Sequence, residues 1–245
     1  MPPIFMLHHV SDDPSHASLK PYSISHDSFL RLLDYLQQHQ FATIGFEELQ
    51  HKKRNAWFKK QVILTFDDCP KHLWDFAIPE LLKRNMKAVF YMPTAHLGEL
   101  NNWDIQEGRK AVHLMDESDL RNLVAIGMEV GSHAHQHVRM NALSFEEVEL
   151  SLIQSKKTLE NITGKEVISM AYPFGEVPLN FEKVIYQAGY QYALSIFYPR
   201  SHLYALRRII YHDGDNIKTI RFKVSILYKI YRSILDRLQK YAVRA

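Results

Sequence analysis

Residues 62–68 read Val-Ile-Leu-Thr-Phe-Asp-Asp, and this stretch decides the fold class of the chain. An unbroken run of apolar and β-branched residues is typical of a strand that is buried on both faces. Strands of that kind belong to parallel sheets, which are covered by helices. Two adjacent carboxylates, Asp67 and Asp68, follow the run directly. Because parallel α/β folds carry their chemistry at the carboxyl ends of strands, we expect these carboxylates at the functional edge. A solvated loop is the alternative for this pair taken alone, since Asp-Asp pairs after strands are common.

The rest of the chain alternates short apolar runs with longer segments of helical period. Strands are predicted over 4–10, 42–44, 62–66, 88–92 and 128–130, and helices over 28–39, 77–84, 118–125 and 144–163. The last helix begins with a capping box, Ser144 with Glu147, and ends at Gly164. Alternation of this kind predicts one α/β domain with a parallel sheet and crossover helices. A barrel and an open doubly wound sheet both satisfy the pattern.

A histidine-rich segment, Gly131-Ser-His-Ala-His-Gln-His137, follows another short strand run. His133 and His137 are four residues apart, so one helical turn would place both imidazoles on one face. Two neutral imidazoles and one carboxylate form a site typical of zinc and similar divalent metals. A surface cluster of histidines is the alternative, but the apolar segments on both sides disfavour it.

Two aromatic features could contact a ligand. Ala171-Tyr-Pro-Phe-Gly175 combines a Pro/Gly turn with the rings of Tyr172 and Phe174. Trp103 lies in the segment 94–113, where no long element is predicted. Aromatic rings pack against sugar faces, but they also fill cores, and spacing alone does not separate the two roles.

Bulk properties limit the classes of protein to consider. Of the 245 residues, 46% are hydrophobic, which suits a globular chain with a full core. No segment approaches the ~20 apolar residues that span a bilayer, and the N-terminus lacks the basic and apolar regions of a secretory signal. The single cysteine, Cys69, excludes an internal disulfide. We therefore expect a cytoplasmic protein.

The net charge of +3 is unevenly distributed. Residues 218–245 contain eight basic side chains and one acidic one, a charge of +7, so residues 1–217 carry 3 − 7 = −4. Apolar residues recur at helical spacing from 221 to 241. We predict a basic amphipathic helix over 218–245, distinct from a catalytic domain over 1–217. Docking on the domain, peripheral contact with anionic lipid on the inner face of the membrane, and nucleic-acid binding are the alternatives, and the acidic body disfavours the last.

The order of the motifs resembles a known family. Thr-Phe-Asp-Asp after a strand, then His-x-x-x-His, then Tyr-Pro-Phe-Gly, is similar to the polysaccharide deacetylases with a NodB-type domain, which form carbohydrate esterase family 4. Further segments resemble the exopolysaccharide and O-antigen branch of that family: Phe5-Met-Leu-His-His-Val10, Pro21-Tyr-Ser-Ile-Ser25, the segment from Leu114 to Gly131, and Tyr204-Ala-Leu-Arg-Arg-Ile209. The resemblance covers about residues 4 to 222.

This resemblance implies a fold, a cofactor and roles for the site residues. The fold would be a deformed (β/α)7 barrel in a single domain. Asp68, His133 and His137 would bind a divalent metal, with zinc the expected ion, and Asp67 would be the general base. Tyr172 and Phe174 would contact substrate, with a backbone amide between 172 and 174 stabilising the oxyanion.

The chain departs from the family pattern at four points. Cys69 replaces a glycine, Ala134 replaces a serine or threonine, and Ala171 occupies the position of an arginine that orients the base. We interpret Cys69 as a small buried residue rather than a functional thiol. The general acid is the fourth departure, because His8 and His212 are both candidates and neither matches the usual late histidine well.

The predicted function is a metal-dependent hydrolase that removes an N-acetyl or N-formyl group from an amino sugar, in a polysaccharide or in a lipid-linked glycan precursor. The alternative is a catalytically decayed, glycan-binding or regulatory protein on the same fold. A nucleic-acid partner is not expected.

Overall fold

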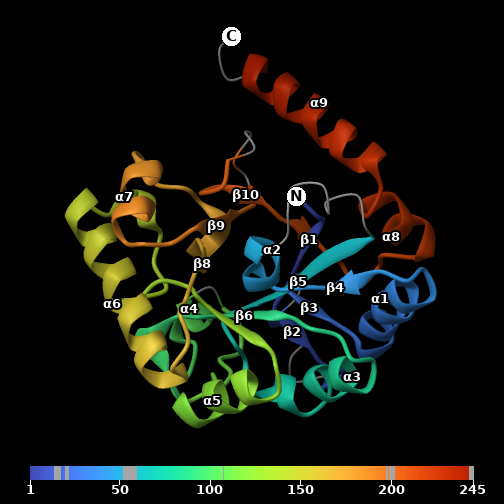
Figure 1. The fold of residues 1–245 in the computed structure, drawn as a ribbon, viewed down its shortest axis with the longest axis horizontal. Coiled ribbons are helices and arrows are strands. Elements are labelled where there is room, and N and C mark those ends of the chain that lie inside the picture. Colours follow the sequence, from blue (N-terminus) through green and yellow to red (C-terminus); the bar gives the residue numbers. More distant parts are fainter. Residues whose placement is uncertain are drawn as a thin grey trace.

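Strands and helices alternate along the chain as predicted, and the helices surround the strands (Figure 1). The structure is a computed structural model that describes residues 1–13, 18–19, 22–51, 60–106, 108–196, 198 and 202–242. Pro21, part of one family-like segment, and Arg244 of the basic tail therefore lie outside the described residues.

The main sheet is parallel at every pairing described. Its strands are β1 (Ile4–Leu7), β4 (Ala42–Thr43), β5 (Gln61–Asp67), β6 (Val89–Met92), β7 (Glu129–Ser132), β8 (Ser169–Ala171), β9 (Tyr192–Ser195), β10 (Leu206–Arg207) and β11 (Ile209–Ile210). Their order is β10-β9-β8-β7-β6-β5-β1-β11, with β4 paired to β5. A second, two-stranded sheet joins β2 (His9–Val10) to β3 (Ser23–Ile24).

One short segment brings the two edges of the main sheet together. β10 pairs with β9 at one edge, and β11 pairs with β1 at the other. Only Arg208 separates β10 from β11 in the sequence. The segment 206–210 therefore connects β9 to β1, and the sheet forms a nearly closed barrel. We call 206–210 the closing segment. Of the two arrangements that alternation allows, the structure is the barrel.

The described helices are α1 (His26–Gln38), α2 (Phe46–His51), α3 (Ala77–Lys83), α4 (Asn102–Gln106), α5 (Glu117–Ala125), α6 (Phe145–Thr163), α7 (Phe181–Gln187), α8 (Ile217–Lys223) and α9 (Ile226–Ala242). Most of them lie on the outer face of the barrel. α2 differs, because Phe46 and Leu49 pack into the interior of the barrel. α6 begins with the predicted capping box of Ser144 and Glu147, and Gly164 ends it in the left-handed conformation, with φ of 66°.

Alternation along β5 divides its side chains between two cores. Leu64 and Phe66 point outward into the core between barrel and helices. Ile63 belongs to the inner cluster. Because side chains two residues apart share a face, Asp67 points to the inside of the barrel, at the carboxyl end of the strand.

The predicted C-terminal helix is divided into two helices. Ile220 of α8 is buried, and α8 packs against α1. α9 projects from the body beyond α8 (Figure 1). Within the described residues, no helix is long and apolar enough to span a membrane.

Candidate active site

The end of β5 turns sharply and carries both carboxylates into the barrel mouth. Asp67 is the last residue of the strand, and the next two residues, Asp68 and Cys69, have φ values of 65° and 54°. Positive φ is unfavourable for residues with a Cβ atom, which explains why glycine suits the position that Cys69 occupies here. The Cys69 side chain is fully buried, and burial together with the neighbouring carboxylates raises the pKa of its thiol well above the usual value. Cys69 is thus a small buried residue, as predicted.

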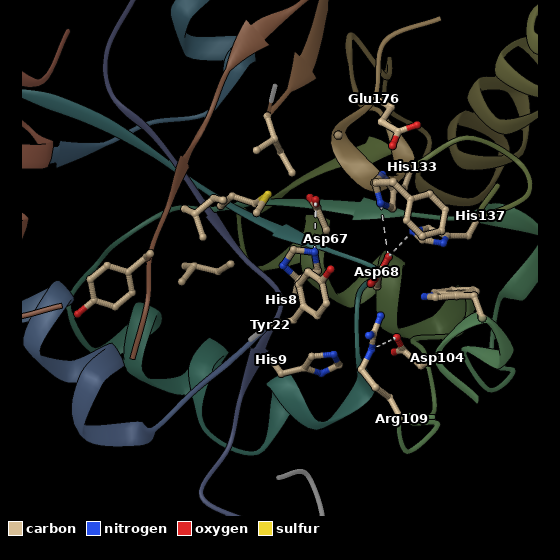
Figure 2. Close-up of a pocket in the computed structure, with 18 of the residues that line it drawn as sticks. His8, His9, Tyr22, Asp67, Asp68, Asp104, Arg109, His133, His137 and Glu176 are labelled. Carbon is tan, nitrogen blue, oxygen red and sulfur yellow. Dashed lines mark hydrogen bonds and ion pairs between the residues drawn. The ribbon is translucent and has the colours of Figure 1, made fainter. Parts of the chain in front are cut away.

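Asp68, His133 and His137 converge in the mouth of the barrel, and we call them the three-ligand cluster (Figure 2). Asp68 Oδ1 lies 3.5 Å from His133 Nε2 and 3.4 Å from His137 Nε2. All three residues are buried. The histidines reach this position from an extended loop, and the predicted helical turn over 133–137 is wrong. Ala134, with φ of 64°, reverses the chain between them instead.

Hydrogen bonding indicates that His133 presents an electron pair rather than a proton to the cluster. His133 Nδ1 lies 2.8 Å from the carbonyl oxygen of Ala171, so Nδ1 carries the proton and Nε2 presents its lone pair to Asp68. Among the described residues, Asp68 Oδ1 has no hydrogen-bond partner despite its burial. A buried acceptor that faces another acceptor at this distance is costly unless a cation lies between them.

The separations fit a divalent metal. Ligand atoms about 2.0–2.1 Å from a tetrahedral ion lie roughly 3.3–3.4 Å from each other, close to the two separations in the cluster. Burial raises the pKa of Asp68, and the charges of Asp67 and Asp104 raise it further. Burial also lowers the pKa of His133 and of His137. A dication would favour the carboxylate of Asp68 and the neutral imidazoles, so the residues present fit the predicted cofactor.

Asp67 is bound by an arginine that the sequence analysis did not identify. Arg208, between β10 and β11, donates from Nη1 to Asp67 Oδ1 at 2.6 Å and from Nη2 to Oδ2 at 2.7 Å. Both side chains are buried. Burial alone would raise the pKa of Asp67, but the Arg208 guanidinium and His133 hold it well below its usual range. Asp67 is therefore ionised at neutral pH, as a general base must be.

The two candidate acids lie at different depths. His8, where β1 ends, has its Nε2 3.8 Å from Asp67 Oδ2. Burial lowers the pKa of His8 to about 4, although Asp67 acts in the opposite direction. His212 also lines the cavity, but its side chain is exposed at the rim. Of the two, His8 lies closer to Asp67.

The third motif sends only one of its two rings into the cavity. Tyr172 is fully buried, its hydroxyl donates to the carbonyl oxygen of Tyr204 at 2.7 Å, and it is not among the cavity-lining residues. This differs from its predicted substrate contact, because the ring supports the loop from behind. Phe174, with φ of 59°, does line the cavity, and its ring centroid lies 4.6 Å from that of His137.

The cavity has a volume of about 390 Å³, and both carboxylates and both metal-candidate histidines line it. Trp103, on α4, stacks on His137 with ring centroids 4.2 Å apart. The cationic groups on the walls are paired: Arg109 with Asp104, and Arg139 with Glu176. The walls therefore combine aromatic rings with nearly compensated charge.

A family model for polysaccharide deacetylase matches residues 54–193, more than half of the chain. The chain belongs to the polysaccharide deacetylase family.

Relatives agree with this assignment. The poly-β-1,6-N-acetyl-D-glucosamine N-deacetylase of Staphylococcus aureus is 25% identical over 213 residues, which cover 81% of this chain and 71% of that protein. The deacetylase PplD of Streptococcus pyogenes, solved with acetate, has a similar fold, with a TM-score of 0.77, 20% identity, and coverage of 92% of this chain and 100% of that one. A de-N-acetylase from Aggregatibacter actinomycetemcomitans also has a similar fold, with a TM-score of 0.75 and 17% identity. The match covers 90% of this chain and 98% of that one. The predicted family, NodB-type barrel and class of hydrolase are confirmed.

Two departures from the family pattern are offset elsewhere in the structure. Arg208, between β10 and β11, binds Asp67, so Ala171 does not leave this carboxylate without an arginine. Ser132 Oγ accepts a hydrogen bond from the Ala134 amide at 3.1 Å, so the histidine loop keeps a hydroxyl that orders it. Arg208 belongs to the family-like segment Tyr204-Ala-Leu-Arg-Arg-Ile209. No feature of the neighbouring residues, however, indicates that this arginine contacts Asp67.

Proposed function

We propose that this protein is an active N-deacetylase of poly-N-acetylglucosamine or a related amino-sugar glycan. Asp67 would be the general base, and Asp68, His133 and His137 would hold a divalent metal, with zinc favoured by the His/His/Asp ligand set. The observation that carries the proposal is the adjacency, in one cavity, of the three-ligand cluster and an arginine-held carboxylate.

When bound, the metal would polarise the acyl carbonyl and lower the pKa of a water molecule at the site. The remaining work falls to the chain. Ionised Asp67 accepts a proton from the attacking water, while the bidentate contact with Arg208 fixes the carboxylate. The hydroxyl adds to the acyl carbon, the C–N bond breaks, and the amine nitrogen must receive a proton.

His8 is the residue best positioned to deliver that proton. At neutral pH it is neutral, because burial lowers its pKa to about 4. It can therefore donate only after gaining a proton, and Asp67 Oδ2 lies 3.8 Å from its Nε2. We propose a relay in which Asp67 takes the proton from water and His8 passes one to the leaving amine.

The Phe174 amide is the proposed donor to the oxyanion. The Tyr172 amide donates to Leu194 within the sheet, and Pro173 has no N–H. Phe174 therefore has the first N–H of this motif that could face the cavity, and its positive φ sets the direction of that bond. One such donor typically contributes 10²–10³ in rate.

The walls of the cavity favour a neutral sugar. Trp103 and Phe174 offer flat apolar surfaces, and the paired Asp104 and Arg109 offer acceptors and donors without a large net charge. The Staphylococcus aureus relative is a poly-β-1,6-N-acetyl-D-glucosamine N-deacetylase. A lipid-linked precursor, or an N-formyl sugar, would present a similar group to the same residues.

The deciding experiment measures both metal and turnover. Untagged protein is analysed for bound metal, and acetate release is followed with N-acetylglucosamine oligomers. We expect about one metal ion per chain, lost in the His133→Ala/His137→Ala double variant. Asp67→Asn should retain the metal and lose at least 10³-fold in rate, whereas Asp75→Asn, at an exposed aspartate, should leave both unchanged.

Metal binding without release of any acyl group, in the presence of oligomer binding, would instead favour the glycan-binding alternative. No metal in the wild type, even after reconstitution, would contradict the mechanism. The proposed peripheral position on a membrane depends on α9 rather than on these residues, and it is tested separately.

A further inference from the structure

α9 presents a broad apolar face to solvent. Its exposed side chains on this face are 47–67% accessible: Ile226, Leu227, Ile230, Tyr231 and Ile234. Their spacing of one and three residues places them on one side of the helix. An exposed stripe of this size on a helix of 17 residues marks an interaction surface.

The contacts of α9 with the body fix the direction of this face. Tyr228 packs against the main core, and Lys229 Nζ donates to the carbonyl oxygen of Met1 at 2.8 Å. These residues lie on the side of the helix opposite the stripe. The apolar face therefore points away from the barrel, and Figure 1 shows the helix extending beyond it. Within the described part of α9, this face is therefore not docked on the barrel, which was one of the predicted alternatives.

Charge distinguishes between the possible occupants. Residues 218–245 carry +7 and the rest of the chain −4. Pairing of the stripes of two copies would bring two +7 tails together, which is unfavourable at low salt. Nucleic acid would bind the basic side chains but would leave the apolar stripe exposed. An anionic bilayer surface accounts for both features, since it buries the stripe and attracts the basic side chains.

We propose that α9 lies in the surface of an anionic membrane, with the five-residue apolar stripe inserted among the lipids. A helix of 17 residues is about 25 Å long, and Arg232, on the side away from the stripe, would remain at the headgroups. This function is independent of the deacetylase reaction.

The attachment point also orients the enzyme. Met1 precedes β1, so α9 begins near the amino-terminal edge of the barrel. Asp67, Asp68 and His133 follow the carboxyl ends of their strands, at the opposite edge. A membrane bound through α9 therefore leaves the mouth of the cavity open to a glycan chain.

Vesicle co-sedimentation of the full chain tests the proposal. We expect binding to vesicles of phosphatidylglycerol and phosphatidylcholine at low salt, and at least tenfold weaker binding to phosphatidylcholine alone. Ile230→Gln/Ile234→Gln and Arg232→Gln/Arg237→Gln should each weaken binding at least tenfold. Leu179→Gln, at a leucine that is 90% exposed on another surface, and Lys157→Gln, at an exposed lysine, are matched controls that should change it less than twofold.

Circular dichroism and melting temperature establish that each variant is folded. Absence of binding to anionic vesicles overturns the proposal, and so does binding that the apolar double variant does not weaken. Sedimentation velocity provides the competing outcome: a concentration-dependent dimer that Ile230→Gln/Ile234→Gln abolishes, without vesicle binding, would assign the stripe to a second copy of the chain. Acetate release from soluble oligomers is measured in parallel, so that loss of membrane binding and loss of catalysis are distinguished.

Discussion

At the scale of single residues, the buried pair of Asp67 and Arg208 links the chemistry of the site to the closure of the barrel. A buried carboxylate is ionised only if a partner compensates the loss of hydration. Arg208 supplies two hydrogen bonds of 2.6 and 2.7 Å. The same residue joins the edge strands β10 and β11, so the geometry of closure also sets the position of the Asp67 carboxylate.

Arg208→Gln should therefore affect pH dependence as well as rate. Without the guanidinium, burial dominates and the pKa of Asp67 rises, so the acid limb of the kcat/KM profile should move to higher pH. We expect a loss of about 10²-fold at neutral pH that diminishes as the pH is raised. The measurement is a pH–rate profile with metal content determined at each pH.

Arg207→Gln, at the neighbouring position of the segment 206–210, is the control. It should not shift the acid limb of the kcat/KM profile. Equal loss of activity at every pH in Arg208→Gln would indicate misfolding or loss of metal rather than a change in Asp67. Removal of one partner of a buried ion pair costs about 3–5 kcal/mol, so folding is verified at the assay temperature.

At the scale of elements, a carboxylate at the amino end of β7 binds the start of α2. Glu129 Oε2 accepts a hydrogen bond from the Glu47 amide at 3.1 Å. Gly45 makes this approach possible, since a Cβ at that position would lie 2.1 Å from the same oxygen. Burial nevertheless raises the pKa of Glu129 from 4.5 to about 7, although the hydrogen bonds from the backbone oppose the rise.

This shift predicts a stability that falls with rising pH. The folded protein binds the Glu129 proton more tightly than the unfolded chain, so the contribution is complete below about pH 4.5 and is lost as the pH passes through 7. Between pH 5.5 and 8, the free energy of unfolding of the wild type should fall relative to that of Glu129→Gln by about 1–3 kcal/mol.

Urea unfolding at the two pH values measures the difference, and Glu146→Gln, at an exposed glutamate of α6, serves as the reference. Parallel stability curves for wild type and Glu129→Gln would contradict the assignment. The experiment probes the end of the barrel opposite the cavity, so it is independent of metal binding.

At the scale of the whole molecule, the three-ligand cluster joins segments that start from β5 and β7. A metal that binds the folded chain but not the unfolded one adds about 4 kcal/mol at a thousand times its Kd. For a chain of 245 residues this corresponds to a rise in Tm of roughly 8–16 °C. We expect a chelator to lower Tm by that order, and zinc to restore it.

His133→Ala/His137→Ala should have a Tm that neither chelator nor zinc changes. Differential scanning calorimetry at fixed pH gives the comparison. A chelator-sensitive Tm in the double variant would place the metal elsewhere in the chain.

The sequence by itself determined what depends on neighbouring residues. The apolar run of β5 predicted a buried parallel strand, Ser144 and Glu147 predicted the start of α6, and the tail predicted an amphipathic helix. The motifs also identified Asp67, Asp68, His133 and His137, because each motif carries its own residue types and spacing. These features arise from interactions over a few residues, and they can be recognised without the fold.

Tertiary structure decided what depends on segments far apart in the chain. Asp67 and Arg208 are 141 residues apart, and only barrel closure brings them together. The loop that carries His133 and His137 is reversed by Ala134 rather than wound into a helical turn, because its ends are set by β7 and α6. The apolar face of α9 points outward because Tyr228 and Lys229 bind the body. In each case the free energy of packing between distant segments, which no local pattern encodes, selected the arrangement.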